Sequence, residues 1–307
     1  MAGVPAVVIT VCRLFDVVWR PAVVLQAFTP LALLAYAVVG LLLLIALART
    51  RRRWLLAPVV LVVAAMALHL AWAAPMVLGS TPAPAPDGTR LTVMTSNIEY
   101  GHGSVADIAA AVRAHDVDLL AVEEITPAAL TRLEQSGALA RLPYRAGRAA
   151  SGLHGTMVFS RTPVSDVRRL PTSMGSWALT VGGWRVMAVH PASPLSAGWA
   201  REEGLLRTAA QEEDPDLVLG DFNATLDHAP LRRLLATGLS DAAQLTNAGW
   251  QPTWPADGYA GLPLPPGAAI DHVLVGPRLT AVRTSTVSVA DTDHRALVAE
   301  VATRAAD

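Results

Sequence analysis

The sequence predicts an α/β domain that follows a helical membrane region, and three features of its 307 residues support this prediction. The first 80 residues are almost continuously apolar, whereas strand-like and helix-like segments alternate over residues 91–302. A short stretch rich in proline and alanine separates the two parts. Only 16% of the residues are charged and 52% are hydrophobic, although soluble domains are usually about one quarter charged, so part of the chain is expected in a membrane.

Two long apolar runs are predicted to cross the membrane. Residues 31–48 carry no charge, and at ~1.5 Å per residue a helix of this length spans roughly 27 Å, close to the ~30 Å hydrocarbon core. Helical residues upstream extend this span to residues 29–48. The second run covers residues 54–78, where His69 is the one ionisable residue. The alternative, a buried helical hairpin of a soluble protein, fits poorly because a nearly uncharged run has no polar face.

The loop between the two runs sets the expected orientation. Arg49, Arg51, Arg52 and Arg53 lie there without an acidic residue, and such basic loops stay in the cytoplasm. The second span then leads outward. Residues 79–307 are therefore expected on the extracytoplasmic side of a multi-pass protein of the cell membrane.

Residues 4–20 leave more than one option within the predicted transmembrane region, residues 1–78. This segment is apolar but short, and Arg13 and Asp16 are spaced so that they can pair on one helix face. It can form a third span, an interfacial helix or part of a signal-like segment, and we favour the third span. Cys12 is the only cysteine of the chain, which excludes an intrachain disulfide and a cysteine-based metal site.

The remainder begins with a linker and continues as a mixed domain. Residues 79–90 read GSTPAPAPDGTR, which is typical of an extended, semi-stiff linker, and residues 91–307 form the predicted domain. Strands are expected at residues 91–97, 117–124, 156–160, 177–181, 184–189, 216–223, 269–276, 280–290 and 295–302, and helices at residues 104–116, 127–137, 198–214 and 229–236. Ser104 can cap the first of these helices, and Gly182-Gly183 is typical of a two-residue hairpin turn. This mixture of strands and helices indicates an α/β sandwich.

Polar side chains lie where several of the apolar strands begin or end. They are Asn97, Glu124, His190, Asp221, Asn223, Asp271, Asp293 and His294. Loops at strand ends are the usual place for catalytic groups in α/β folds, so these residues are the candidates for a functional site.

The segments that contain these residues resemble a known family. The motifs TSNIEYG, DLLAVEEIT, GTMVFSRTPV, VMAVHPASP, LVLGDFNATLDHAPL, IDHVLVG and DTDHRAL occur in the order found in the endonuclease/exonuclease/phosphatase family. That family includes deoxyribonuclease I, apurinic endonucleases, neutral sphingomyelinases and inositol-polyphosphate phosphatases. The resemblance covers about residues 91–302. It implies a four-layer sandwich of two packed β-sheets flanked by helices, and a Mg²⁺-dependent phosphoric ester hydrolase.

The resemblance also implies which residues bind metal. Asn97 and Glu124 match the family's metal-binding residues, and Asp293 is a candidate for a second metal or for the water network. Mg²⁺, or Mn²⁺ in its place, prefers hard oxygen ligands of this kind. Glu123 departs from the pattern, because family members usually carry glutamine at this position, and its role is left open. So is the number of metal ions.

The catalytic roles follow from the same resemblance. Asp221 would orient or deprotonate the attacking water, and Asn223 would donate to a phosphate oxygen. His294 matches the C-terminal catalytic histidine, and Asp271 matches the aspartate that orients it. His190 matches the other active-site histidine and is a candidate phosphate ligand.

Each of these residues has a structural alternative. Asn97 could cap a turn, Glu124 could be an ordinary acid at a helix start, and His190 could be a turn histidine before proline. Arg161 is a weaker candidate for a phosphate contact, and for it a structural ion pair is the preferred interpretation. His272 is expected to be structural.

These inferences converge on a membrane-anchored, metal-dependent phosphoesterase that acts on the extracytoplasmic side. The alternatives are an extracytoplasmic endonuclease or exonuclease on DNA or RNA and, from another class, a non-catalytic membrane binding protein. The chain has no lysine, and residues 81–307 hold 18 basic and 24 acidic residues, a net charge of −6 that disfavours binding to a polyanion. The expected partners are the lipid bilayer and a lipid headgroup or small phosphoester, with nucleic acid second. No obligate protein partner is evident.

Overall fold

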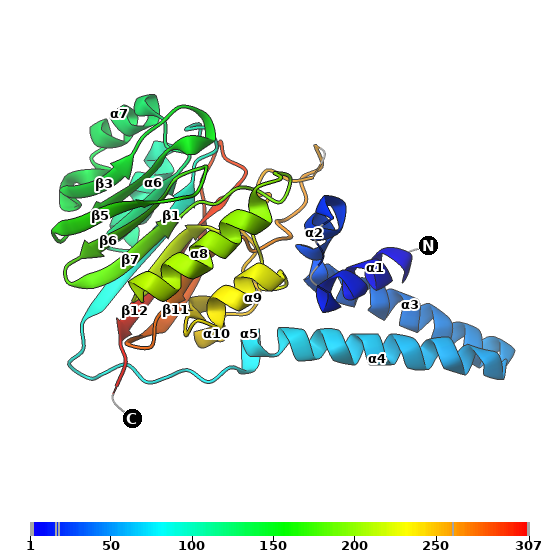
Figure 1. Cartoon of the computed structure of the whole chain (residues 1–307). Coiled ribbons are helices and arrows are strands. Elements are labelled where there is room, and N and C mark those ends of the chain that lie inside the picture. Colours follow the sequence, from blue (N-terminus) through cyan, green and yellow to red (C-terminus); the bar gives the residue numbers. More distant parts are fainter. Residues whose placement is uncertain (1–2, 16, 18, 260, 306–307) are drawn as a thin grey trace.

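The computed structural model describes residues 3–15, 17, 19–259 and 261–305, and it consists of two packed β-sheets flanked by helices with a helical hairpin at one side (Figure 1). The first sheet has the order β11 (Leu279–Ser288), β12 (Arg295–Thr303), β1 (Arg90–Asn97), β2 (Leu119–Glu123), β4 (Thr156–Ser160) and β3 (Tyr144–Arg148). The second has the order β5 (Val164–Leu170), β6 (Ser176–Val181), β7 (Trp184–Val189), β8 (Leu217–Asp221), β10 (Asp271–Val275) and β9 (Ser240–Asp241).

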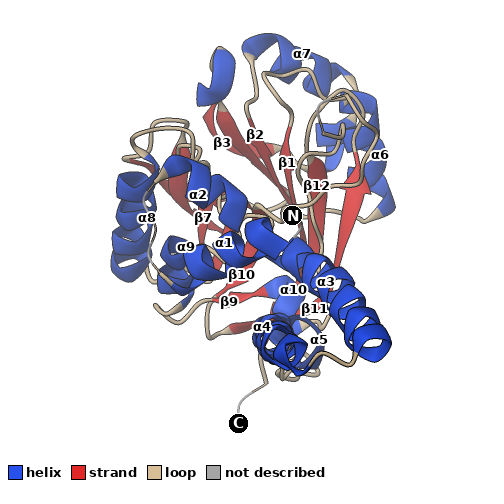
Figure 2. Ribbon diagram, turned by 90° about the vertical axis from the view of Figure 1, so that its right-hand side faces the viewer, coloured by secondary structure: helices blue, strands red, loops and turns tan. Residues whose placement is uncertain are grey.

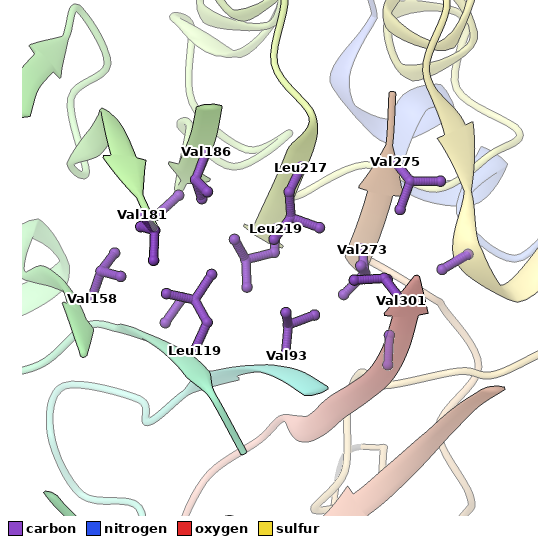
Figure 3. Close-up of a cluster of buried hydrophobic side chains, with 14 of the residues drawn as sticks. Val93, Leu119, Val158, Val181, Val186, Leu217, Leu219, Val273, Val275 and Val301 are labelled. Carbon is purple, nitrogen blue, oxygen red and sulfur yellow. The ribbon is translucent and has the colours of Figure 1, made fainter. Parts of the chain in front are cut away.

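Both sheets are mixed. The pairs β1–β2 and β7–β8 are parallel, whereas β1–β12 and β8–β10 are antiparallel. Aliphatic side chains from the two inner faces, such as Val93, Leu119, Leu219 and Val273, meet between the sheets (Figure 3). This interface is the central core of the domain.

Helices cover the outer faces of the sheets. On the first sheet, Met94 and Leu120 point away from the central core and pack with Ile108 of α6 (Val105–Ala114) and Leu133 of α7 (Pro127–Gln135). The second sheet is covered by α8 (Trp199–Glu213) and α9 (Ala229–Leu235), and α10 (Ala242–Leu245) lies next to β11. Because successive residues of a strand point to opposite faces of the sheet, each buried strand contributes side chains to the central core and to the layer between its own sheet and the covering helices. The predicted fold class, two packed sheets flanked by helices, is confirmed.

Several local predictions also hold. The Ser104 side chain accepts a hydrogen bond from Asp107 N at the start of α6. Gly182 and Gly183 form the β6–β7 hairpin turn with φ of 56° and 90°, which glycine adopts without steric cost. The edge strands β3 and β5 were not predicted.

The N-terminal region holds two helices that are long and apolar enough to cross a membrane. They are α3 (Thr29–Thr50) and the stretch Arg53–Ala73, which contains a 3₁₀ turn (Arg53–Leu55) and α4 (Leu56–Ala73). The two helices form an antiparallel hairpin that projects from the domain in Figure 1 and faces the viewer in Figure 2. A short helix, α5 (Pro75–Leu78), follows. By length and composition they are candidate spans.

The first residues form two shorter helices rather than one long one. The helix α1 (Gly3–Leu14) packs against α3, and α2 (Arg20–Gln26) follows after a break. A third span over residues 4–20 stays a prediction, and no continuous helix carries it. The predicted partner of Arg13, Asp16, lies outside the described residues. Arg13 instead pairs with Asp227, its Nε 2.8 Å from Oδ1.

The predicted linker follows the surface of the domain and contains a turn at Pro86 and Asp87, where Gly88 N donates to Ala85 O at 3.1 Å. Ala85 N donates to Thr303 O at 2.8 Å, and Pro82 O accepts from Thr280 Oγ1 at 2.9 Å. These hydrogen bonds tie the segment to the two edge-most strands of the first sheet, β11 and β12.

Candidate active site

The candidate residues come together because strand ends from both sheets meet at one place. Asn97 ends β1 and Glu124 follows β2, its parallel neighbour in the first sheet. In the second sheet Asp221 ends β8, and Asp271 is its direct partner at the start of the antiparallel strand β10. His190 follows β7, the parallel neighbour of β8, and His294 comes directly before β12.

Glu124 is held in an unusual backbone conformation. Its φ is +56°, a left-handed value that is uncommon for residues other than glycine and concentrates at functional sites. Its carboxylate accepts hydrogen bonds from Asn97 Nδ2 at 3.1 Å and from Tyr100 N at 2.8 Å. Burial raises the pKa of Glu124, partly offset by these two donors.

Asn97 connects the carboxylates of the two sheets. Its Nδ2 donates to Glu124 and, at 3.0 Å, to Asp221 Oδ2, while its Oδ1 accepts from Glu99 N at 3.0 Å. The amide nitrogen therefore faces the carboxylates in this arrangement. The predicted role of the amide oxygen as a metal ligand stays a prediction.

His294 and Asp271 form a buried pair. His294 Nδ1 lies 2.9 Å from Asp271 Oδ2, and its Nε2 is 3.7 Å from Asp221 Oδ2 and 3.8 Å from Asp293 Oδ1. Burial of this imidazole lowers its pKa. The neighbouring carboxylates, of which Asp271 has the largest effect, raise it by more, so the pKa of His294 is about 10. His294 is therefore a cation at neutral pH.

His190 has the opposite character. Burial lowers its pKa to about 4, although Asp221 opposes this shift, so the imidazole is neutral at pH 7. Its Nε2 lies 3.6 Å from Asp221 Oδ2 and 3.9 Å from Glu124 Oε1. Within the described part of the chain, its buried Nδ1 has no hydrogen-bond partner.

The donor set fits a divalent cation. Ligand atoms of Asp221, Asp271 and His294 lie within 4.8 Å of one another, and Glu124 adds a further carboxylate. Burial raises the pKa of Asp221 and of Glu124, which a bound cation would counteract. Among the described atoms, Asp271 Oδ1 is buried without a partner. The carboxylates of this group can hold a metal ion, whereas His294 would be a ligand only after losing its proton.

Two further predicted residues border the cluster. Asn223, with φ of +49°, donates from its backbone N to Asp221 Oδ1 at 2.8 Å and from Nδ2 to Pro191 O at 3.1 Å. The carboxylate of Asp293 accepts a hydrogen bond from Trp254 Nε1 at 2.9 Å. Both residues line the same cavity as the cluster.

Arg161 is not at the site. Arg161 follows Ser160, the last residue of β4, which pairs with Leu119 at the start of β2. Arg161 therefore lies at the opposite ends of these strands from Glu124, which follows the end of β2. There it forms ion pairs with Asp116 at 2.8 Å and Asp118 at 2.9 Å. Its predicted phosphate contact is wrong, because the strand register points it away from the cluster, and the structural ion pair is confirmed.

Glu123, whose role the sequence left open, is fully buried behind the cluster. Its Oε1 accepts from Thr95 Oγ1 at 2.8 Å, and burial, reinforced by Asp271 and Asp221, raises its pKa to about 8. The side chain is therefore mostly protonated at neutral pH. As a neutral hydrogen-bonding group it resembles the glutamine expected at this position. His272 is structural, since its ring bonds to Asp241 and to Ala224 O.

The cavity in front of the cluster measures about 370 Å³ and contains residues that the sequence did not single out. Glu99 and Tyr100 belong to the loop after Asn97, and their positive φ values of 38° and 52° are the consequence of a sharp turn. The unforeseen lining residues also include Val24, Ala27 and Phe28, in or next to α2, far away in the sequence.

Comparison with known proteins identifies the group to which this site belongs. Residues 94–294 match the model of the Endonuclease/Exonuclease/phosphatase family. The chain belongs to the endonuclease/exonuclease/phosphatase family. The predicted resemblance is thus confirmed, and the matched segment includes every residue of the cluster from Asn97 to His294. No curated protein sequence matches the chain.

Several solved structures share the fold. A 3′ phosphatase, NExo, from Neisseria, bound to a product DNA hairpin, is 19% identical with a TM-score of 0.56, over 68% of this chain and 98% of that one. TDP2 from D. rerio, complexed with a single-strand DNA product, is 15% identical with a TM-score of 0.56, over 69% and 99%. An AP endonuclease from Archaeoglobus fulgidus is 15% identical with a TM-score of 0.54, over 68% and 98%.

Proposed function

We propose that this protein is a membrane-anchored, Mg²⁺-dependent phosphoric ester hydrolase whose site lies outside the cytoplasm. One observation carries the proposal. Glu124, Asp221 and His294 line a single cavity at the meeting point of the two sheets, and Asn97 and Asp271 hydrogen-bond to them. Carboxylates beside a buried imidazole–carboxylate pair are the groups that metal-assisted hydrolysis requires.

Glu124 would supply a carboxylate oxygen for Mg²⁺ or Mn²⁺, with Asn97 beside it. The ion, when bound, would polarise the phosphoryl oxygen and stabilise the leaving oxyanion. Asp293, whose carboxylate is fixed by Trp254, is the candidate for a second ion or for ordering water.

The side chains of the protein would divide the remaining steps. Asp221, anchored by Asn97 and by the backbone of Asn223, would orient the attacking water and accept its proton. His294, held by Asp271 and protonated at neutral pH, would donate from Nε2 to a phosphate oxygen. His190, neutral and buried on the other side of Asp221, would be the second phosphate ligand.

Anchoring is supported by the surface of the helical hairpin. Leu34, Leu41 and Leu61 are 65%, 59% and 70% exposed, and soluble proteins rarely leave such continuous apolar surface uncovered. We infer that the C-terminal end of α1 lies on the same side of the membrane as the catalytic domain, because Arg13 in its last turn pairs with Asp227 of that domain. Both the favoured three-span topology and a two-span topology satisfy this contact. The arginines at residues 49–53 favour a cytoplasmic loop.

The substrate is expected to be a lipid headgroup or another small phosphoester. The net charge of −6 over residues 81–307 and the absence of lysine weaken long-range attraction to nucleic acid. A nuclease is the second candidate, favoured by solved structures of the fold that hold DNA products.

The test uses the purified full chain in detergent with nucleic acids, phospholipids and sugar phosphates as substrates. We expect hydrolysis that EDTA abolishes and Mg²⁺ or Mn²⁺ restores. Glu124→Gln removes a ligand charge but keeps an acceptor for Tyr100 N, so its rate should fall at least ~100-fold in a folded protein. Glu134→Gln, an exposed glutamate paired with Arg145, is the matched control.

Three outcomes would contradict the proposal or part of it. Full activity of the wild-type protein in chelator would exclude the metal. Efficient plasmid nicking at physiological salt, without turnover of lipid or small phosphoesters, would favour the nuclease. No hydrolysis of any substrate would favour the non-catalytic alternative.

A further inference from the structure

One wall of the active-site cavity comes from the membrane-anchoring region. Val24 of α2 and Ala27 and Phe28 directly after it line the cavity whose other side holds His190, Asp221 and His294. In Figures 1 and 2, α2 lies between the catalytic domain and the helical hairpin. The cavity is therefore bounded by residues 24–28 and by segments of the catalytic domain that lie far from them in sequence.

This wall is fixed to the catalytic domain by specific contacts. Val23 is buried among core residues of the second sheet and its helices. Its carbonyl oxygen accepts from His228 Nε2 at 2.8 Å, and Gln26 Nε2 donates to the carbonyl oxygen of Asp227 at 2.6 Å. The ion pair of Arg13 with the Asp227 side chain adds a third point. The position of α2 beside the cavity is therefore fixed by specific contacts with the catalytic domain.

The surface that α2 adds is apolar. The Phe28 ring lies 6.5 Å from that of Trp254 and 5.8 Å from that of Tyr259, measured between centroids. Ala27 packs with Ala268 and Ile270. The cavity is thus lined by carboxylates and imidazoles and also by an aromatic and aliphatic wall, whose Trp254 donates a hydrogen bond to Asp293. A substrate that fills it needs an apolar part next to its phosphate.

The position of the wall indicates where that apolar part comes from. Phe28 directly precedes Thr29, the first residue of the candidate span α3, so the wall lies where the chain would enter the bilayer. We propose that the wall formed by Val24, Ala27, Phe28 and Trp254 binds the hydrocarbon chain of a membrane phospholipid while its phosphate sits at the catalytic cluster. This inference rests on the proposed phosphoesterase function.

The test measures how rate depends on hydrocarbon length. A series of p-nitrophenyl alkyl phosphodiesters, from methyl to octyl, is hydrolysed when water adds to phosphorus and p-nitrophenolate leaves. The full chain is assayed in phosphatidylcholine nanodiscs with Mg²⁺. Each methylene that becomes buried favours binding up to about fourfold. We expect kcat/KM of the wild-type protein to rise at least tenfold between the methyl and the octyl ester.

Variants assign this preference to the wall. Phe28→Ala and, independently, Val24→Ser should reduce the octyl-to-methyl ratio of kcat/KM at least fivefold, whereas the conservative Phe28→Leu should keep most of it. Leu25→Ala is the matched control, because Leu25 is a partly exposed residue of the same helix that lies outside the described lining of the cavity, and its ratio should equal that of the wild type.

The outcomes separate this inference from the function on which it rests. Hydrolysis of the whole series at rates independent of chain length would overturn the lipid wall and leave the phosphoesterase intact. So would a ratio unchanged in both Phe28→Ala and Val24→Ser. If the wild-type protein hydrolyses none of the esters with Mg²⁺ present, the proposed function fails and the inference fails with it.

Discussion

Two histidines of the same cavity have opposite charge states, although both are buried. The pKa of His190 falls to about 4 because burial disfavours its charged form, while direct contact with Asp271 raises that of His294 to about 10. The difference lies in the hydrogen bond, since His294 Nδ1 has a carboxylate partner at 2.9 Å and His190 Nδ1 has none among the described residues. A neutral ligand and a cationic donor can therefore act on one phosphate.

This assignment predicts a graded loss of activity. His294→Ala removes the cation and should lower kcat by about 10²–10⁴-fold, the usual range for a positioned proton donor. Asp271→Asn keeps the ring in place but removes the carboxylate, so its loss should be smaller. Steady-state kinetics on the best substrate measures both. His115→Ala, at the end of α6 and outside the cavity lining, should retain the wild-type rate. Wild-type rates in both His294→Ala and Asp271→Asn would show that the catalytic site lies elsewhere in the protein.

At the level of elements, the register of two strand pairs decides which residues meet. The parallel pair β1–β2 brings Asn97 and Glu124 to one sheet edge, and the antiparallel pair β8–β10 places Asp221 opposite Asp271. Strand register also explains the position of Arg161, because β4 runs antiparallel to β2 and its last residues lie at the opposite end of the strands from Glu124. A motif near the site in sequence is thus not necessarily near it in space.

The sequence predicted the parts of the structure that have a local signal. The strand-forming stretch around Val93 and Met94, the Ser104 cap and the Gly182-Gly183 turn each depend on neighbours in the chain. The edge strand β5 was missed because most of its residues are exposed and it lacks such an apolar stretch.

The tertiary contacts of the site could not be read in the same way. Family motifs identified the cluster from Asn97 to His294, but motifs do not encode the direction of the Asn97 amide. The contact of Phe28 with the cavity joins segments that no local pattern connects. Such long-range packing depends on the complete fold rather than on adjacent residues.

The docking of α2 predicts a dependence of stability on pH. His228 Nδ1 accepts from Thr225 N at 2.8 Å, and its Nε2 bonds to Val23 O, so a second proton on the ring would face a donor. Burial lowers the pKa of His228 to about 4, with Arg232 and Arg13 adding to the shift. The folded pKa is below the ordinary ~6.5, so this stabilisation is complete above pH ~6.5 and falls by about 3 kcal/mol as pH drops to ~4.

Thermal unfolding of the full chain in detergent between pH 4 and 7 measures this effect. His228→Gln can keep both hydrogen bonds without a titrating group, so its unfolding temperature should fall less steeply with acid than that of the wild type. His115→Gln should follow the wild-type curve. Identical curves for His228→Gln and wild type would show that α2 docks independently of this ring.

The whole molecule is organised around a hairpin that is fixed at both ends. Before the hairpin, α2 packs on the second sheet and its helices through Val23. After it, Met76 O accepts from Gly249 N at 2.9 Å, and Gly79 N donates to Asn247 Oδ1 at 2.7 Å. The catalytic domain is therefore held in one orientation relative to the hairpin instead of swinging on a flexible tether.

The orientation across the membrane can be tested by cysteine labelling. In a Cys12→Ser background, Asp87→Cys in the linker should react with a membrane-impermeant maleimide in intact cells, because the proposed orientation places the linker outside. Thr50→Cys, at the cytoplasmic end of α3, should react only after permeabilisation. The reverse pattern would invert the orientation, and labelling of both in intact cells would argue against spans.

The double attachment of the hairpin also bears on how the protein would respond to a protease. A single cut in the segment near Pro82–Pro86 divides the polypeptide but leaves Val23, Gln26 and Arg13 bound to their partners in the larger piece. The two fragments should remain a working pair that purifies together and separates only under denaturing conditions. Shedding of the catalytic domain would require a break in the α2 contacts as well, so a nick alone would not release the domain from the cell surface.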